Sequence, residues 1–297
     1  MPLAATGDLV TRAAARHGAV AAFNVITLEH IEAVVAAAEA ARAPVILQVS
    51  ENAVRFHGGR LAPLAAAAVQ CAEPSTVPVA LHLDHVTTGD LLHEAADRGF
   101  GSVMFDAAHL PYAENVAATR EAAAWAHAAG LWLEAELGEV GGKDGRGPLP
   151  AHTPGARTEP GEARRFVEET GVDALAVAIG SSHAMTSRDA RLDHDLLRAL
   201  HDALDVPLVL HGSSGVPDEE LRRAVRGGIA KVNIGTALGA AMTAAVRAHL
   251  AGDERTVDPR SYLAAGRGAI IEAAGRLLPT VTPATVTPPT VTPATTA

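Results

Sequence analysis

The 297 residues are 48% apolar and 20% charged, which provides enough apolar material for a full hydrophobic core in one large domain or two smaller ones. A formal charge of −10, without a cluster of Lys or Arg and with 3% aromatic residues, argues against nucleic-acid binding. One cysteine, Cys71, cannot form a disulfide framework, and neither a signal peptide nor a window of about 18 apolar residues is visible, so we expect a cytoplasmic protein that does not enter membranes.

Taken in chain order, eight apolar segments have the length and composition of β-strands. Stretches with helical spacing lie between them, for example residues 28–43, 112–130 and 217–228, which are rich in Ala, Leu, Glu and Arg. Alternating strands and helices indicate parallel strands, so we predict an α/β fold, a (β/α)8 TIM barrel, with a doubly wound open sheet as the alternative. The predicted strands cover residues 19–25, 44–50, 77–85, 101–107, 131–138, 174–180, 206–212 and 229–235.

The end of the chain differs from the rest in composition. Residues 279–297 repeat Thr, Val and Pro, carry no charge and show no helical pattern. Such a segment cannot bury enough apolar surface to order itself. We therefore predict a barrel domain over residues 1–278 and a disordered, extended tail over residues 279–297 without a catalytic part.

Polar residues stand at the ends of most predicted strands. Catalytic residues of a TIM barrel lie at the C-terminal ends of its strands, which form one rim of the barrel. The apolar segment 77–85 ends in Asp84 and His85, and we interpret this strand as a rigid wall that supports two active-site side chains. At or just after the other strand ends stand Asn24, Ser50, Asp106, Glu136, His183, His211 and Asn233.

Three of these residues are histidines, namely His85, His183 and His211. Neutral imidazoles suit Zn²⁺, and three protein ligands with an open position are typical of a catalytic zinc site. Hydrogen-bonded structural histidines are the alternative that the residues alone leave open. His82 shares side-chain parity with Asp84 and not with His85, so we expect it to support the site rather than bind metal.

Two loops rich in small residues follow the seventh and eighth predicted strands, at residues 210–220 and 232–236. TIM barrels commonly bind phosphate at these two loops, through backbone N–H groups and a helix N-terminus. We therefore predict a phosphate site there, and two tight turns without a ligand are the alternative.

Five motifs stand at the predicted strand ends, in the order LHLDH, LEAELGEVGG, VDALAVAIGSSH, PLVLHGSSGVPDE and KVNIGT. Together they resemble the class II, metal-dependent fructose-bisphosphate aldolases, and more particularly the shorter branch that includes tagatose-bisphosphate aldolases. The resemblance runs from about residue 1 to residue 278 and implies the (β/α)8 barrel.

The resemblance also implies roles for single residues. Asp84 matches the acid/base that handles the proton of the C4 hydroxyl, and Arg260 matches an arginine that reaches a second phosphate across a subunit contact. The matching metal-pocket residues are the zinc ligands His85, His183 and His211 and the acidic residues Asp106 and Glu136, which are linked to alternative metal positions or to support of the site. The matching substrate-binding residues are Asn24, Ser50, Gly212, Ser214, Asn233, Gly235, Thr236 and Arg260.

The implied activity is the reversible, zinc-dependent cleavage of fructose 1,6-bisphosphate to dihydroxyacetone phosphate and glyceraldehyde 3-phosphate by a homodimer or homotetramer, with a monovalent or second divalent cation as a further cofactor. Cleavage leaves an enediolate, whose charge needs a Lewis acid or a Schiff base. The chain has two lysines, Lys143 in a Gly-rich loop and Lys231 in the last predicted strand. We interpret Lys231 as a buried counter-charge for a carboxylate, which favours the metal mechanism.

Other substrates and functions remain open at this point. Tagatose 1,6-bisphosphate or another phosphorylated ketose is the alternative substrate. A metal-dependent barrel hydrolase typically carries a His-x-His pair on its first strand, which residues 19–25 lack. A sugar-phosphate-binding barrel without activity is expected to lose Asp84 or a zinc histidine, and the chain keeps all four residues.

The chain departs from the family pattern at several positions. A second acid is expected in the loop 141–160, where the best match is Asp144, one methylene shorter than the family's Glu. Ser213 replaces a glycine, which costs about 1 kcal/mol or more if that position needs a positive φ. Ala184 and Val86 replace glycines that follow the second and first histidines. We expect these changes to bear on substrate choice rather than on reaction class.

Overall fold

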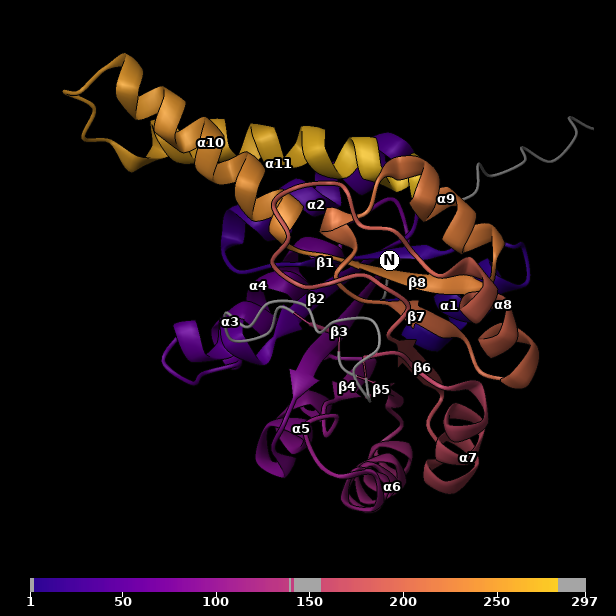
Figure 1. Ribbon diagram of the computed structural model, residues 1–297. Helices are drawn as coiled ribbons and strands as arrows, with labels where there is room; N and C mark the ends of the chain where they lie inside the picture. Colours follow the sequence, from indigo (N-terminus) through magenta and orange to yellow (C-terminus); the bar gives the residue numbers. More distant parts are fainter. Residues whose placement is uncertain (1–2, 139, 142–155, 283–297) are drawn as a thin grey trace, which may run out of the picture.

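The computed structural model describes residues 3–138, 140–141 and 156–282. Eight parallel strands follow one another around a closed barrel, and β1 pairs with β8 (Figure 1). This pairing closes the sheet, which confirms the predicted TIM barrel and rules out the open sheet. The strands are β1 (Val20–Asn24), β2 (Val45–Ser50), β3 (Val79–Val86), β4 (Ser102–Phe105), β5 (Trp132–Leu137), β6 (Ala174–Val177), β7 (Leu208–Leu210) and β8 (Ile229–Ile234).

Helices connect the strands and cover the outside of the barrel. Several begin at a side-chain cap: the carboxylates of Asp193 and Asp258 accept backbone N–H groups at the starts of α8 and α11. The helices are α1 (Thr6–Ala14), α2 (Leu28–Ala41), α3 (Glu51–Phe56), α4 (Ala62–Ala72), α5 (Gly89–Ala96), α6 (Tyr112–Ala128), α7 (Pro160–Thr170), α8 (His194–Ala203), the short η2 (Ser213–Gly215), α9 (Asp218–Arg226), α10 (Thr236–Gly252) and α11 (Pro259–Val281).

The core has two parts because strand side chains alternate between the faces of the sheet. Outward-facing residues such as Phe23, Leu47 and Leu81 are buried under the helices. Inside the barrel, apolar residues of β1 and β2 pack against Leu9 and Val10 of α1. Helix α1 therefore closes the N-terminal end of the barrel, and the polar residues of the interior lie nearer the C-terminal ends of the strands.

Between these apolar residues and the C-terminal ends of the strands, the barrel interior contains polar side chains. Five side chains there have no solvent exposure, which for polar groups requires hydrogen-bonded or charged partners. They come from β2, β3, β4, β5 and β8 and are Gln48, His82, Ser102, Glu134 and Lys231. A layer of charged and hydrogen-bonding groups therefore lies inside the barrel, beneath the C-terminal ends of the strands.

Helices α10 and α11 form an antiparallel hairpin whose far end projects away from the barrel (Figure 1). Helix α11 continues to Val281, three residues past the predicted domain boundary at residue 278. Val281 is 1% exposed, and its carbonyl accepts the N–H of Ala19 at 3.0 Å, so these residues belong to the barrel. Residues 283–297 lie outside the described residues, and the disordered tail stays a prediction. Within the described residues, no helix has the length and apolar character needed to cross a bilayer.

Candidate active site

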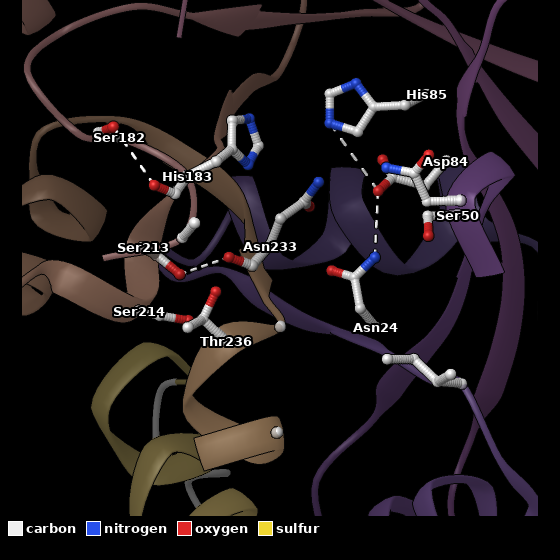
Figure 2. A pocket seen from close by; sticks show the side chains of 16 residues that line it. Asn24, Ser50, Asp84, His85, Ser182, His183, Ser213, Ser214, Asn233 and Thr236 are labelled. Atoms are coloured by element: carbon white, nitrogen blue, oxygen red, sulfur yellow. Dashed lines mark hydrogen bonds and ion pairs between the residues drawn. The ribbon is translucent and has the colours of Figure 1, made fainter. Parts of the chain in front are cut away.

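A cavity of about 310 Å³ opens at the C-terminal ends of the strands. Its lining comes from β1, β2, β3, β8 and the loops after β6 and β7, in agreement with the rim predicted for a TIM barrel. Figure 2 shows these side chains pointing toward one another around the cavity. The sequence-predicted residues among them are Asn24, Ser50, Asp84, His85, His183, Gly212, Ser214, Asn233, Gly235 and Thr236.

Four potential metal ligands gather beside this cavity, and two of them, His85 and His183, line it. His85, Glu136, His183 and His211 each offer one ligand atom, and these atoms lie within 4.8 Å of one another. The imidazole centroids of the three histidines are 5.0 to 5.8 Å apart. Three imidazoles and a carboxylate at such distances fit the donor set that zinc prefers.

His85 owes its position to an irregular end of β3. The register between β3 and β4 shifts between Leu83 and Val86, and His85 has a φ of 54°, in the left-handed region. Its Nδ1 lies 2.7 Å from Oδ2 of Asp106. Asp106 therefore touches the ring of His85 and is not among the four residues whose ligand atoms gather within 4.8 Å.

His211 is fully buried between two glutamates of β5. Its Nε2 lies 2.9 Å from Oε1 of Glu134, and its Nδ1 lies 3.0 Å from Oε2 of Glu136. Burial alone would lower the pKa of His211, but the hydrogen bond with Glu134 and the adjacent carboxylate of Glu136 outweigh it and raise the pKa to about 9. The ring is therefore held on both sides by negative charge, an environment that attracts a cation.

The charge of Glu134 is balanced by Lys231 of β8, whose Nζ lies 2.8 Å from Oε2 of Glu134. Burial would raise the pKa of Glu134, but Lys231 and His211 hold it well below its usual range. The same Nζ donates to Oδ1 of Asn233 at 2.8 Å. The interpretation of Lys231 as a buried counter-charge for a carboxylate is thus confirmed.

Asp84 is held by a chain of two amides. Asn24 donates its Nδ2 to Oδ2 of Asp84 at 3.1 Å (Figure 2). Gln48 in turn donates its Nε2 to Oδ1 of Asn24 at 3.2 Å. Burial would raise the pKa of Asp84, but the nearby charges of His85 and His211, with others, leave it below its usual value. Asp84 is therefore a fixed carboxylate at neutral pH.

The loop after β7 turns at Gly212, whose φ is 65°. A Cβ there would lie 2.5 Å from the carbonyl carbon of Ser182, so the position requires glycine. Ser213 lies in the following 3-10 helix and is not among the positive-φ residues, so the cost foreseen for it does not arise. Ala184, by contrast, has a φ of 56° and does occupy the left-handed region.

The two predicted phosphate loops lie against each other and form part of the cavity wall. Helix α10 begins at Thr236, and Ser214 accepts the N–H of Ala237 at 3.1 Å. The hydroxyl of Ser213 donates to the carbonyl oxygen of Asn233 and ties the two loops together. Hydroxyls and a helix N-terminus thus face the cavity, an arrangement suited to an anion.

Of the remaining predicted residues, one is not described and one lies away from the cavity. Asp144 lies outside the described residues, as does Lys143. Arg260 lies at the start of α11, at the projecting end of the hairpin, where its side chain is 90% exposed and pairs with Asp258 at 2.6 Å. The cavity of this chain is formed without Arg260.

Sequence reasoning missed Glu134 and Gln48, which touch His211 and Asn24 respectively. Each stands two residues before a predicted site residue of its strand, Glu136 and Ser50, and so faces the same interior. That spacing was the available signal. His82, expected as a support, contacts Ser102 at 2.8 Å and lies 3.9 Å from Glu134.

Comparisons with known proteins agree with this geometry. The family model described as fructose-bisphosphate aldolase class-II matches residues 4–282. A fructose-bisphosphate aldolase of Geobacillus stearothermophilus is 39% identical over 275 residues, covering 91% of this chain and 93% of that protein. One of Giardia intestinalis is 38% identical over an alignment of 300 residues, covering 92% and 90%. The crystal structure of the YdjI aldolase from Escherichia coli K12 has a TM-score of 0.82 and 34% identity, covering 94% and 97%. The chain therefore belongs to the class II fructose-bisphosphate aldolase family.

Proposed function

We propose that this chain is a zinc-dependent lyase that reversibly cleaves fructose 1,6-bisphosphate to dihydroxyacetone phosphate and glyceraldehyde 3-phosphate. The observation that carries the proposal is that ligand atoms of three histidines lie within 4.8 Å of one another. The carboxylate of Asp84 lies 4.0 Å from Nε2 of one of them, His85. Carbon–carbon cleavage of a ketose needs an electron-withdrawing centre at the carbonyl and a base at the neighbouring hydroxyl. The names of the relatives support the same reaction.

The proposed zinc ligands are His85, His183 and His211, with Glu136 as a further carboxylate of the same group. When bound there, zinc supplies a Lewis acid for substrate oxygens. The contact of Asp106 with Nδ1 of His85 supports a role in fixing that ring. The further monovalent or divalent cation implied by the family resemblance stays a prediction.

Asp84 is proposed to take the proton of the C4 hydroxyl as the carbon–carbon bond breaks, and to return it in the condensation direction. Asn24 occupies its Oδ2, whereas Oδ1 accepts no hydrogen bond from the described residues. Oδ1 is therefore the oxygen that we assign to the substrate proton. The lowered pKa of Asp84 supports this assignment because it keeps the group ready as a base.

A Schiff-base mechanism finds no support at Lys231. Its Nζ has no solvent exposure and is engaged by Glu134 and Asn233, each at 2.8 Å. Lys231 is also absent from the described lining of the cavity, so its amine does not reach a substrate carbonyl there. Lys231 therefore acts through its charge.

The two phosphates of the substrate are proposed to bind differently. The described lining of the cavity holds neither Lys nor Arg, so one phosphate binds backbone N–H groups and hydroxyls at the loops of Gly212, Ser214, Gly235 and Thr236. The other phosphate needs a cation from elsewhere. We propose that Arg260 supplies it to a partner subunit, in a homodimer or homotetramer, because Arg260 stands at the start of α11 with a 90% exposed side chain and does not line its own cavity.

Asp144 keeps its proposed role as a second proton carrier, at the carbon that becomes part of dihydroxyacetone phosphate. This role rests on its match in the sequence alone, since Asp144 lies outside the described residues.

The test is triose-phosphate release from fructose 1,6-bisphosphate and, in parallel, from tagatose 1,6-bisphosphate. Each reaction is run with and without EDTA, with Zn²⁺ added back, and with borohydride as a trap for a Schiff base. We expect faster cleavage of the fructose substrate, loss of activity in EDTA, recovery with Zn²⁺ and no effect of borohydride. No cleavage of either sugar by zinc-loaded protein would overturn the proposal, and faster tagatose cleavage would change the assigned substrate.

A further inference from the structure

Glu51 connects the ends of two neighbouring strands through its carboxylate. It is the first residue of α3, directly after Ser50 of β2, and is 8% exposed. Its Oε2 accepts the backbone N–H of Thr87 at 2.7 Å, and the hydroxyl of Thr87 lies 3.0 and 2.9 Å from the two carboxylate oxygens. A buried carboxylate that takes both donors of one residue fixes that residue strongly.

Thr87 stands two residues after His85, whose backbone is in the left-handed region at a break in the β3–β4 register. Such a conformation persists only when its surroundings hold it. On the β4 side, the N–H of Asp106 donates to the carbonyl of Val86 at 2.8 Å. On the β2 side, Glu51 holds Thr87. The end of β3 that carries His85 is therefore held on both sides, by the residues that directly follow β2 and β4.

We propose that Glu51 is a positioning residue for the metal ligand His85, acting through Thr87 and the backbone between them. This inference rests on the proposed metal site. Without the Glu51 carboxylate, the turn after His85 is free on its β2 side, and the backbone of His85 can relax toward the extended region. The imidazole then leaves the group of ligand atoms that lies within 4.8 Å.

A contact from Arg55 supports the same role. Arg55, one turn later in α3, pairs with the carboxylate of Glu51. The side chain of Arg55 is 62% exposed and that of Glu51 is 11% exposed, so the guanidinium covers the carboxylate from the solvent side. The carboxylate is thereby confined between Arg55 and Thr87, and its orientation is fixed from two directions.

The chain provides a control contact just before the start of β3, with the same donor and acceptor groups in a more exposed setting. Glu39 of α2 accepts the N–H of Thr76 at 2.8 Å and its hydroxyl at 3.1 Å, just before β3 begins. This contact has the same chemistry as the one between Glu51 and Thr87, but it lies at the opposite end of the strand, away from the cavity. Loss of Glu39 therefore reports the structural effect of removing such a contact, without an effect on His85.

The experiment measures Co²⁺ binding to the full-length apoprotein by the d–d absorption of the bound ion. The variants are Glu51→Ala, Glu51→Gln, Thr87→Val and the control Glu39→Ala, each with its melting temperature. We expect Co²⁺ affinity to fall about 10- to 100-fold in Glu51→Ala, the range seen when groups that orient metal ligands are removed, together with a changed absorption spectrum. Glu51→Gln keeps one acceptor oxygen and Thr87→Val keeps the backbone donor, so both should retain part of the affinity. Glu39→Ala should bind Co²⁺ as the wild type does.

Two results would overturn the proposal. If Glu51→Ala binds Co²⁺ with wild-type affinity and spectrum, Glu51 is only a structural contact and the metal site itself stands. Should Glu51→Ala not fold, the same result for Thr87→Val and Glu51→Gln leads to the same conclusion. If the wild type binds no Co²⁺ at all, the metal site fails and this inference fails with it. The wild-type titration therefore separates the two failures.

Discussion

Lys231 and Glu134 form an ion pair inside the barrel in which neither side chain is exposed, with Nζ 2.8 Å from Oε2. The other oxygen of Glu134 contacts His211, so one carboxylate of β5 joins the lysine of β8 to a proposed metal ligand that directly follows β7. Removing one partner of such a pair leaves a buried charge without compensation, which is far more costly than the loss of a surface pair.

We expect Lys231→Met to lower the free energy of unfolding by about 3–5 kcal/mol, because the buried carboxylate of Glu134 loses the lysine that balances its charge and keeps only its contact with His211. Urea unfolding of the apoprotein measures this change. The control is Arg267→Met, which removes a pair with Glu32 at the surface and should cost about 0–1 kcal/mol. A Lys231→Met protein as stable as the control would contradict the assigned role of the pair.

Asp84→Asn should lower kcat by about 10²–10⁴, because the amide cannot accept the proton of the C4 hydroxyl. The shape is preserved, and Asn24 still has an oxygen at the position of Oδ2 to which it can donate. Zinc content, measured by atomic absorption, should stay at the wild-type level, since Asp84 is not in the group of ligand atoms. Loss of zinc together with activity would show that Asp84 serves the metal and not the substrate proton.

Gly212→Ala and Gly171→Ala test whether crowding at the loop after β7 matters. Both glycines have a positive φ, of 65° and 70°, so both variants carry a backbone cost of about 1 kcal/mol. A Cβ at Gly171 meets nothing within 4 Å, whereas one at Gly212 lies 2.5 Å from backbone of Ser182. We expect Gly212→Ala to be less stable than Gly171→Ala by a further 1–3 kcal/mol or so, and to raise KM for the bisphosphate. Equal unfolding free energies would refute the tight contact.

The stability of the protein should depend on pH through His82. Burial, together with the charge of Lys231, lowers the pKa of His82 to about 3, whereas an unfolded histidine titrates near pH 6.5. Between these values the unfolded chain binds more protons, so the contribution of His82 is complete above about pH 6.5 and is lost as the pH falls toward 3.

The variant His82→Gln should therefore show a smaller change of unfolding free energy with pH in this window, by up to about 1.4 kcal/mol per pH unit. Chemical denaturation at several pH values between 4 and 8 measures both slopes. Above pH 7 the two slopes should coincide, which serves as the internal control. Parallel curves at every pH would contradict a neutral, buried His82.

The sequence predicted the barrel well because each strand is a short apolar run next to a helical pattern, and both signals are local. One difference is at β6, which ends at Val177 although the predicted segment continues to residue 180. Apolar residues continue there because Ala178 and Ile179 are buried in the turn that leads to His183. The predicted strand was therefore too long, because buried apolar residues continue beyond Val177, the last residue of β6.

The candidate site was predictable where a polar residue stands at a strand end, as with Asp84 or Asn233, because the rim of a barrel is its one polar edge. Deeper in the strands the signal was weaker: Gln48 and Glu134 share a face with Ser50 and Glu136, but the apolar pattern of the strands assigns such positions to packing. The place of Arg260 follows from the length and direction of α10 and α11, which no local pattern specifies.

The pairing of β1 with β8 has a consequence for folding during synthesis, because β1 is made first and β8 last. Val20 is paired with Lys231 in this ladder, so the edge of β1 has no partner until nearly the whole barrel has left the ribosome. An unpaired strand edge is open to association with other chains. The buried charge that β8 brings, Lys231, also arrives last and meets Glu134 only then. Closure of the barrel and pairing of Glu134 with Lys231 are therefore one event, and a nascent chain that lacks β8 keeps both an open strand edge and a Glu134 without its lysine.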